Sequence, residues 1–300
     1  MKKRIIITGG NGQDGIILSK LLLKKKYLIY SFVKKKNFIK IPGVKYLYDN
    51  LSNYYLIDKI IKEIKPFAIV HLAAKNISTV NIKTMKRNFF YKKNLLITKN
   101  LINSIIKNDK KIKFIFAGSS LMFEKTKGVA NESSRFKANC YYSKYKIDAY
   151  NYIEKMKKKF KLFATTIILF NHDSKYRNSK FLFPRLVKYL KSNKLNHVKK
   201  IYSQNIFGDF SHAEDICNGI FLLIKSNKNP NKIIFSSNNL LRLNNLIDYG
   251  LVKLKIKKNI TTKTHKKTIK LIGNNNLAKK LLKWFPKKNS LLAFKEILKN

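Results

Sequence analysis

Cysteine, proline and acidic residues are scarce in this 300-residue chain. The two cysteines, Cys140 and Cys217, lie far apart and follow no paired spacing, which excludes a disulfide framework or a zinc cluster. No apolar run approaches the roughly 20 residues that a membrane-spanning helix requires. The apolar stretch after Met1 is also shorter than the roughly 7–15 residues of a secretory signal. These absences predict a cytoplasmic protein with no membrane partner.

Arginine is scarce as well, whereas lysine is abundant. The chain has 65 Lys and Arg residues against 15 Asp and Glu residues, a formal net charge of +50, and only six of the basic residues are arginines. Such a charge attracts nucleic acid, but nucleic-acid surfaces usually concentrate Arg, and here lysines are spread along the whole chain. We therefore interpret the charge as a compositional bias and do not expect a nucleic-acid partner. Polyanion binding stays open as the alternative.

Apolar runs of strand length alternate with segments of helical periodicity through the first 170 residues, which predicts βαβ units. Strands are expected near 4–8, 28–33, 45–48, 68–72, 112–117 and 165–170, and helices near 14–26, 53–64, 87–107 and 141–160. We expect an α/β fold with a Rossmann-type, doubly wound parallel sheet over residues 1–170. Residues 171–300, with helices near 182–192, 214–226, 243–255 and 276–298, should mainly form a smaller C-terminal substrate-binding lobe, although later segments could return to the sheet.

Glycines at positions 9, 12 and 15 lie between the first predicted strand and the first predicted helix. In this context glycine permits a tight turn, lets backbone N–H groups approach a pyrophosphate at the helix N-terminus, and lets helix and strand pack closely. The second strand ends in Val33-Lys34-Lys35-Lys36-Asn37, where a basic side chain would accept a ribose 2′-phosphate. The sequence therefore predicts a dinucleotide cofactor and favours NADP over NAD.

Tyr142 and Lys146 lie four residues apart and share one face of the predicted helix 141–160. An ammonium in that position would lower the pKa of the phenol towards neutrality, so that a tyrosinate could take a proton from a sugar hydroxyl as hydride leaves the same carbon. Ser119 follows the fifth predicted strand, where its hydroxyl would bond a substrate oxygen. Strand end, hydroxyl and Tyr/Lys pair together indicate a reductase-type site.

Several longer stretches resemble those of a known family. They are Ile7–Gly15, His71–Lys75, Tyr142–Tyr150, Leu169–Ser174, Asp209–Asp215 and Ala278–Lys287. On these residues the chain resembles the extended short-chain dehydrogenase/reductases, also described as the NAD-dependent epimerase/dehydratase family, and most of all the GDP-mannose 4,6-dehydratases. The resemblance implies a lyase cycle in which hydride leaves C4 of the sugar for NADP⁺, water is lost across C5 and C6, and hydride returns to C6.

The resemblance also implies roles for individual residues. Ser119 would bond the 4-oxygen, Tyr142 would be the base and Lys146 its electrostatic partner, while Asn171 and Arg185 would bind the sugar diphosphate. Cofactor contacts are expected at Gly9, Gly12, Gln13, Asp14, Gly15, Lys34, Lys35, Asn50, Leu51, Leu72, Ala73, Ala74, Tyr142, Lys146 and His172. The implied partners are a nucleotide sugar, GDP-linked, and further copies of the chain in a homodimer or homotetramer.

One departure from the family's pattern concerns the reaction type. The dehydratases carry a Glu two positions after the hydroxyl residue, where this chain has Leu121, and Glu124 and Glu132 are candidate replacements. Because leucine cannot act as a base, a GDP-4-keto-6-deoxy-sugar reductase or a 4-epimerase on the same scaffold stays open. A non-catalytic, polyanion-binding relative is the alternative of another class. No Asp, Glu, His or Cys grouping has metal-ligand spacing, so no metal is expected.

Overall fold

The computed structural model describes residues 2–34, 38–48, 50–75, 84–256 and 268–300, with backbone alone for 84–86. A seven-stranded sheet forms the centre of the molecule. Its strands are β1 (Arg4–Thr8), β2 (Leu28–Phe32), β3 (Val44–Leu47), β4 (Ala68–His71), β5 (Lys113–Ala117), β7 (Ala164–Leu169) and β11 (Lys232–Phe235). They lie in the order β11-β7-β5-β4-β1-β2-β3, and each neighbouring pair is parallel.

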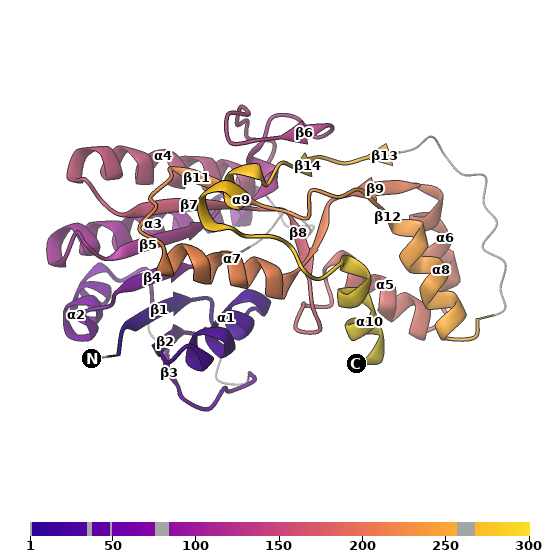
Figure 1. Cartoon of the computed structure of the whole chain (residues 1–300), viewed down its shortest axis with the longest axis horizontal. Helices are drawn as coiled ribbons and strands as arrows, with labels where there is room; N and C mark the ends of the chain where they lie inside the picture. The colour runs from indigo at the N-terminus through magenta and orange to yellow at the C-terminus, as the bar shows by residue number, and fades with distance from the viewer. Residues whose placement is uncertain (1, 35–37, 49, 76–83, 257–267) are drawn as a thin grey trace.

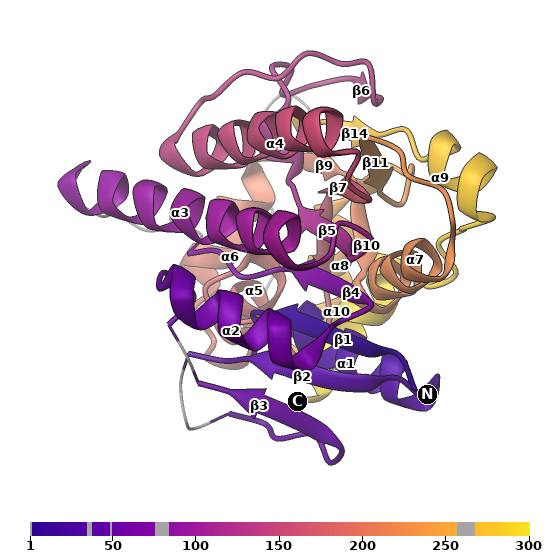
Figure 2. The same ribbon diagram turned by 90° about the vertical axis from the view of Figure 1, so that its left-hand side faces the viewer.

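Helices cover both faces of this sheet, as Figure 2 shows. They are α1 (Gln13–Lys24), α2 (Tyr54–Ile64), α3 (Thr84–Asn108), α4 (Tyr141–Phe160), α7 (Ala213–Lys225) and α9 (Asn276–Leu282). Side chains of a strand alternate between the faces, so Ile5 and Ile7 pack towards α1 and α7, whereas Ile6 packs towards α2, α3 and α4. The order of the strands reverses between β1 and β4, and the ends of these two strands define the crevice where such folds bind ligands.

A second lobe lies beyond the carboxyl ends of the strands, at the right of Figure 1. It contains α5 (Leu182–Lys191), α6 (Leu195–Ser203), α8 (Leu243–Lys253), α10 (Ser290–Lys299), β9 (Ile206–Gly208), β12 (Leu241–Arg242) and β13 (Thr268–Ile269). Phe183, Leu246 and Phe294 are buried in its own apolar core. The remaining short elements are β6 (Val129–Ala130), β8 (Asn171–Asp173), β10 (Phe210–His212), β14 (Ile272–Gly273) and the 3₁₀ turn η1 (Ser120–Met122).

The predicted doubly wound sheet is confirmed, and helix 141–160 has the predicted bounds. The expectation of one helix near 276–298 is wrong. The segment forms two helices because Lys283 ends α9 in a left-handed conformation, with φ of 53°, and Pro286 follows. Helix α6 was not anticipated. Within the described residues, no helix is long and apolar enough to cross a membrane.

Candidate active site

The glycine loop after β1 is shaped by close backbone approaches. Gly9 adopts a positive φ of 78°, and a side chain at Gly10 would place its Cβ 1.7 Å from the Ser31 hydroxyl. At Gly15, a Cβ would lie 2.5 Å from the Gly9 carbonyl, so helix α1 packs directly onto the loop. Gly12 is the N-cap residue of α1, and no described side chain caps the first-turn N–H groups of this helix. These N–H groups can therefore bind a pyrophosphate, and the loop fits a dinucleotide.

Asp14 in the first turn of α1 would repel a pyrophosphate if its charge were uncompensated. The imidazole Nε2 of His172, on β8, lies 3.1 Å from both of its carboxylate oxygens. Burial raises the pKa of Asp14, but the charge and hydrogen bond of His172, together with the Arg177 charge and the Gln13 hydrogen bond, outweigh burial, and the pKa falls to about 2. Gln13 joins the same two segments, because its amide donates to the His172 carbonyl and its carbonyl accepts from Ser174.

Arg177 is a site residue that the sequence reasoning missed. Its guanidinium Nε lies 3.3 Å from a carboxylate oxygen of the buried Asp173, and its charge also lowers the pKa values of Asp14 and Tyr142. The residue is one of only six arginines and lies five positions after His172. The scarcity of arginine was the signal in the sequence that could have identified Arg177. The cluster at the start of α1 thus carries two cationic groups and two carboxylates.

The other predicted cofactor contacts lie near the ends of β2, β3 and β4. Lys34 is exposed two residues after β2, whereas Lys35 lies outside the described residues. Asn50 is exposed in a turn before α2, and Leu51 is half-buried against the α2–α3 face. Three residues after β4 are half-buried, namely Leu72, Ala73 and Ala74. The structure thus brings the described members of this set to the carboxyl edge of the sheet.

Tyr142 and Lys146 lie one turn apart in α4, where α4 passes the end of β5. Lys146 is 2% exposed, and its Nζ donates to the Ala117 carbonyl at 2.5 Å. The same ammonium lies 5.5 Å from the centre of the Tyr142 ring and 4.6 Å from that of Phe116. Burial lowers the pKa of Lys146 to about 7, which leaves this lysine poised between its two protonation states at neutral pH.

The expected lowering of the Tyr142 pKa is not found. Burial raises the pKa of Tyr142 to about 12, with Arg177 as the main opposing influence. Desolvation penalises both charged forms, so Lys146 loses its proton before Tyr142 does. The ammonium also lies over the ring of Tyr142. Tyr142 is consequently a protonated phenol at neutral pH.

Ser119 begins the η1 turn just beyond β5, and its hydroxyl oxygen accepts the N–H of Leu121 at 3.2 Å. Leu121, in the position of the expected base, is 45% exposed. Glu132 is occupied elsewhere, because its carboxylate accepts the Ile234 N–H at 2.9 Å on β11. Glu124 is exposed and faces Lys137 at 3.4 Å. Both candidate replacement carboxylates therefore have other partners.

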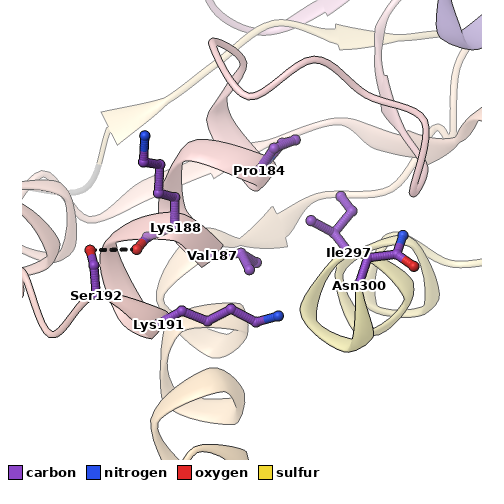
Figure 3. A pocket seen from close by; sticks show the side chains of 7 residues that line it. All are labelled: Pro184, Val187, Lys188, Lys191, Ser192, Ile297 and Asn300. Atoms are coloured by element: carbon purple, nitrogen blue, oxygen red, sulfur yellow. Dashed lines mark hydrogen bonds between the residues drawn. The ribbon is translucent and has the colours of Figure 1, made fainter. Parts of the chain in front are cut away.

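Of the two predicted substrate contacts, one lies on β8, which follows the sheet strand β7, and the other lies on the lobe helix α5. Asn171 is exposed at the start of β8, and Arg185 is half-buried on α5. A shallow hollow of about 380 Å³ lies on the lobe between α5 and α10 (Figure 3). It is lined by Pro184, Val187, Lys188, Lys191, Ser192, Ile297 and Asn300, and none of these is a predicted site residue. No three His, Cys, Asp or Glu side chains gather as metal ligands in the described part of the chain.

The sequence of this chain is similar to those of one family of proteins. The sequence profile of the family described as GDP-mannose 4,6 dehydratase matches residues 6–298. GDP-mannose 4,6 dehydratase 1 of Arabidopsis thaliana is 24% identical over 99% of this chain and 88% of its own length. The GDP-mannose 4,6 dehydratase of Homo sapiens is 25% identical over 76% of this chain and 66% of its own length.

Solved structures show the same fold at low sequence identity. The UDP-glucose 4-epimerase of Thermotoga maritima has a TM-score of 0.82 at 16% identity, covering 99% of this chain and 97% of its own. The dTDP-glucose 4,6-dehydratase of Bacillus anthracis, solved in complex with NAD, has a TM-score of 0.78 at 18% identity, covering 99% and 96%. Fold and site together define an extended short-chain dehydrogenase/reductase. Since the family profile spans nearly the whole chain, the protein belongs to the GDP-mannose 4,6-dehydratase family.

Proposed function

We propose that the protein is an NADP-dependent enzyme that modifies a GDP-linked hexose in the cytoplasm by hydride transfer at C4, in the manner of a GDP-mannose 4,6-dehydratase. The observation that carries this proposal is the buried Lys146 ammonium. It is held at the end of β5 and lies 5.5 Å from the ring centre of Tyr142, next to the turn that begins with Ser119. Because desolvation penalises the charge of a buried lysine, its burial at this position supports a functional role.

The described residues that would hold the cofactor follow the carboxyl ends of β1, β2, β3 and β4. The glycine loop and the uncapped start of α1 suit the pyrophosphate, and the cationic pair of His172 and Arg177 compensates Asp14 next to it. Lys34 after β2 suits a ribose 2′-phosphate, which favours NADP. A bound nicotinamide supplies a hydride acceptor and donor.

The chain's own groups then manage the proton at the 4-oxygen. Ser119 would hydrogen-bond this oxygen, and Tyr142 would exchange a proton with it. When Tyr142 acts as a base, the Lys146 ammonium would stabilise the tyrosinate, since opposite charges attract strongly away from water. Asn171 and Arg185 would bind the diphosphate of the substrate, Arg185 by charge-assisted hydrogen bonds.

Loss of water across C5 and C6 would complete the dehydratase cycle, and this step needs a base at C5. Two observations favour a second candidate, a 4-keto-sugar reductase or a 4-epimerase. Leu121 occupies the position of the expected base, and Glu132 is tied to the backbone of β11. Tyr142 is also a protonated phenol, ready to give a proton to a keto oxygen, as reduction requires.

Incubation of the purified protein with GDP-mannose and NADP⁺ tests the first candidate. A 4-keto-6-deoxy product supports the dehydratase, whereas turnover of a supplied 4-keto sugar with NADPH alone supports the reductase. Tyr142→Phe should reduce either turnover by about 10²–10⁴-fold and leave NADPH affinity intact. Unchanged turnover in this variant would contradict the assignment of Tyr142.

The same proposal covers the roles of the two halves of the chain and its oligomeric state. Residues 1–170 would mainly bind the cofactor and residues 171–300 the sugar nucleotide. We also propose a homodimer or homotetramer, for which Phe89 and Leu96 on α3, 59% and 46% exposed, provide apolar contacts. Sedimentation equilibrium tests this, since a monomer at micromolar concentration would contradict it.

A further inference from the structure

His71, the last residue of β4, lies in a buried chain of hydrogen bonds at the cofactor edge of the sheet. The residue is 1% exposed. Its Nδ1 lies 2.7 Å from the Thr8 hydroxyl at the end of β1. Its Nε2 lies 3.0 Å from the Thr98 hydroxyl on α3. His71 thus connects two strands that border the ligand crevice with one of the helices that cover the sheet.

The neighbours of these hydrogen-bonded groups indicate one direction for each hydrogen bond between them. Thr98 donates its one hydroxyl hydrogen to the Asn94 carbonyl at 3.2 Å, because a carbonyl can only accept. With this hydrogen used, we infer that the Thr98 oxygen accepts from His71 Nε2–H. At the other end, the Thr8 oxygen accepts the Ala73 N–H at 3.1 Å and is free to donate to His71 Nδ1.

The resulting state of His71 is the neutral imidazole with its hydrogen on Nε2. Burial, and next the nearby Lys146 charge, lower the pKa of His71 to about 3. Both influences disfavour an imidazolium, which would also deprive the Thr8 hydroxyl of its acceptor. The ring therefore stays neutral over the whole physiological pH range and keeps one hydrogen-bond direction.

This series of hydrogen bonds joins the cofactor loops to α4, the helix that carries Tyr142 and Lys146. At one end, the Ala73 segment packs on the glycine loop, since a Cβ on Gly9 would lie 3.0 Å from the Ala73 nitrogen. At the other end, Thr98 meets the Tyr145 hydroxyl at 3.3 Å, and because the Thr98 hydrogen is already used, Tyr145 is the donor. Tyr145 lies on α4 between Tyr142 and Lys146, with its ring centre 6.4 Å from that of Tyr142.

We propose that His71, through Thr8 and Thr98, is a positioning residue that fixes the cofactor loops relative to the helix bearing Tyr142 and Lys146. The inference rests on the proposed NADP-dependent function. It assigns to this buried histidine an indirect role, exerted through the loop Leu72–Ala74 and through Tyr145. The role requires the Nε2–H form of the ring.

Thr98→Val removes the acceptor of the His71 N–H while keeping the shape of the side chain. We expect it to raise the Kd for NADPH by about 3- to 10-fold in a fluorescence titration, and Thr98→Ser to restore wild-type affinity. Thr165→Val is the matched control. It removes an equally buried hydroxyl, bonded to the Pro230 carbonyl at 2.8 Å at the opposite end of the sheet, and should leave the Kd within twofold.

A ¹⁵N spectrum of the histidine rings in the wild-type protein tests the same inference without a variant. We expect the His71 ring to be neutral with its hydrogen on Nε2, and Thr98→Val should shift the His71 resonances. Wild-type NADPH affinity in Thr98→Val, or a His71 hydrogen on Nδ1, would overturn this inference alone. Failure of the wild-type protein to bind NADPH or NADH would overturn the proposed function as well.

Discussion

The imidazole of His172 lies 3.1 Å from both carboxylate oxygens of Asp14, although 158 positions separate them in the chain. Its other nitrogen, Nδ1, lies 2.7 Å from the Phe170 carbonyl. Both ring nitrogens therefore face acceptors, which only the imidazolium can satisfy with two donors. Burial opposes this charge, but the Asp14 carboxylate outweighs burial, and the pKa of His172 rises above its usual 6.5.

The Asp14–His172 pair predicts a pH dependence of stability. Its His172 contribution is complete below pH 6.5 and is lost as the pH rises through the higher pKa of the folded protein. Its Asp14 contribution is complete above pH 3.8 and is lost as the pH falls through about 2. We expect Asp14→Asn to lower the free energy of unfolding by about 3 kcal/mol between pH 4 and 6.5. Urea unfolding should show this loss shrinking at higher pH, and a pH-independent difference would contradict the ion pair.

Lys146 predicts a conflict between stability and activity. Between its folded pKa of about 7 and the ordinary 10.5, the unfolded chain binds more protons, so the stability of the wild-type protein rises with pH over this range. We expect Lys146→Met to raise the free energy of unfolding at pH 7 by about 3 kcal/mol and to flatten this pH dependence. Turnover should fall by at least about 10²-fold.

Lys144→Met is the matched control for this prediction. Lys144 lies in the same turn of α4 but is exposed and paired with Asp148 at 2.9 Å. Its removal should change the free energy of unfolding by less than about 1 kcal/mol. Unfolding curves measured at pH 7 and pH 10 check both variants. A Lys146→Met protein less stable than wild type at both pH values would refute the buried charge.

Leu121 predicts a gain of function. Because the side chain is 45% exposed in the turn next to Ser119, a carboxylate fits there without burial. We expect Leu121→Glu to increase formation of the 4-keto-6-deoxy product at least about tenfold, while Leu121→Gln, which has no basic carboxylate, does not. Product analysis by mass spectrometry checks this. Equal elimination in all three proteins would show that the C5 base lies elsewhere.

The net charge of +50 predicts stabilisation by salt. Like charges repel in the compact state, and raising the ionic strength from about 0.1 to 1 M shortens the screening length from about 10 to 3 Å. We expect the Tm to rise by several degrees as NaCl increases over this range. A Tm that falls or stays constant would show that the lysines are already neutralised by bound anions.

The polyanion-binding alternative makes a different prediction. A non-catalytic relative would bind RNA or DNA tightly at about 0.15 M salt, with a steep salt dependence, and would not bind NADPH. The proposed enzyme should show NADPH binding and only weak, salt-sensitive attachment to nucleic acid. Parallel titrations with NADPH and with a mixed-sequence duplex separate the two possibilities.

Local patterns in the sequence predicted most of the fold. The first strand and helix 141–160 have the predicted bounds, because their apolar periodicity is clear and their flanking residues mark where they begin and end. The strand–glycine–helix context also placed the loop Gly9–Gly12 between β1 and α1 correctly. These features depend on residues adjacent in the chain, and such residues determine local structure largely by themselves.

Features that depend on distant residues could not be predicted in this way. Asp14 and His172 are in contact although 158 positions separate them in the chain. The role of Arg177 depends on this contact. The pKa of Tyr142 was predicted in the wrong direction, because spacing along a helix gives the neighbours of a phenol but not its burial. Tertiary packing determines both the Asp14–His172 contact and the pKa of Tyr142.

Strand β11 arrives from the lobe half of the chain and pairs with β7 along Ile167 and Ile168. A polypeptide that stopped at residue 170 would leave the edge of β7 open, with two adjacent isoleucines beside unpaired backbone groups. Such a fragment would self-associate instead of folding into a cofactor carrier. The cofactor-binding and substrate-binding halves therefore cannot be exchanged separately between relatives.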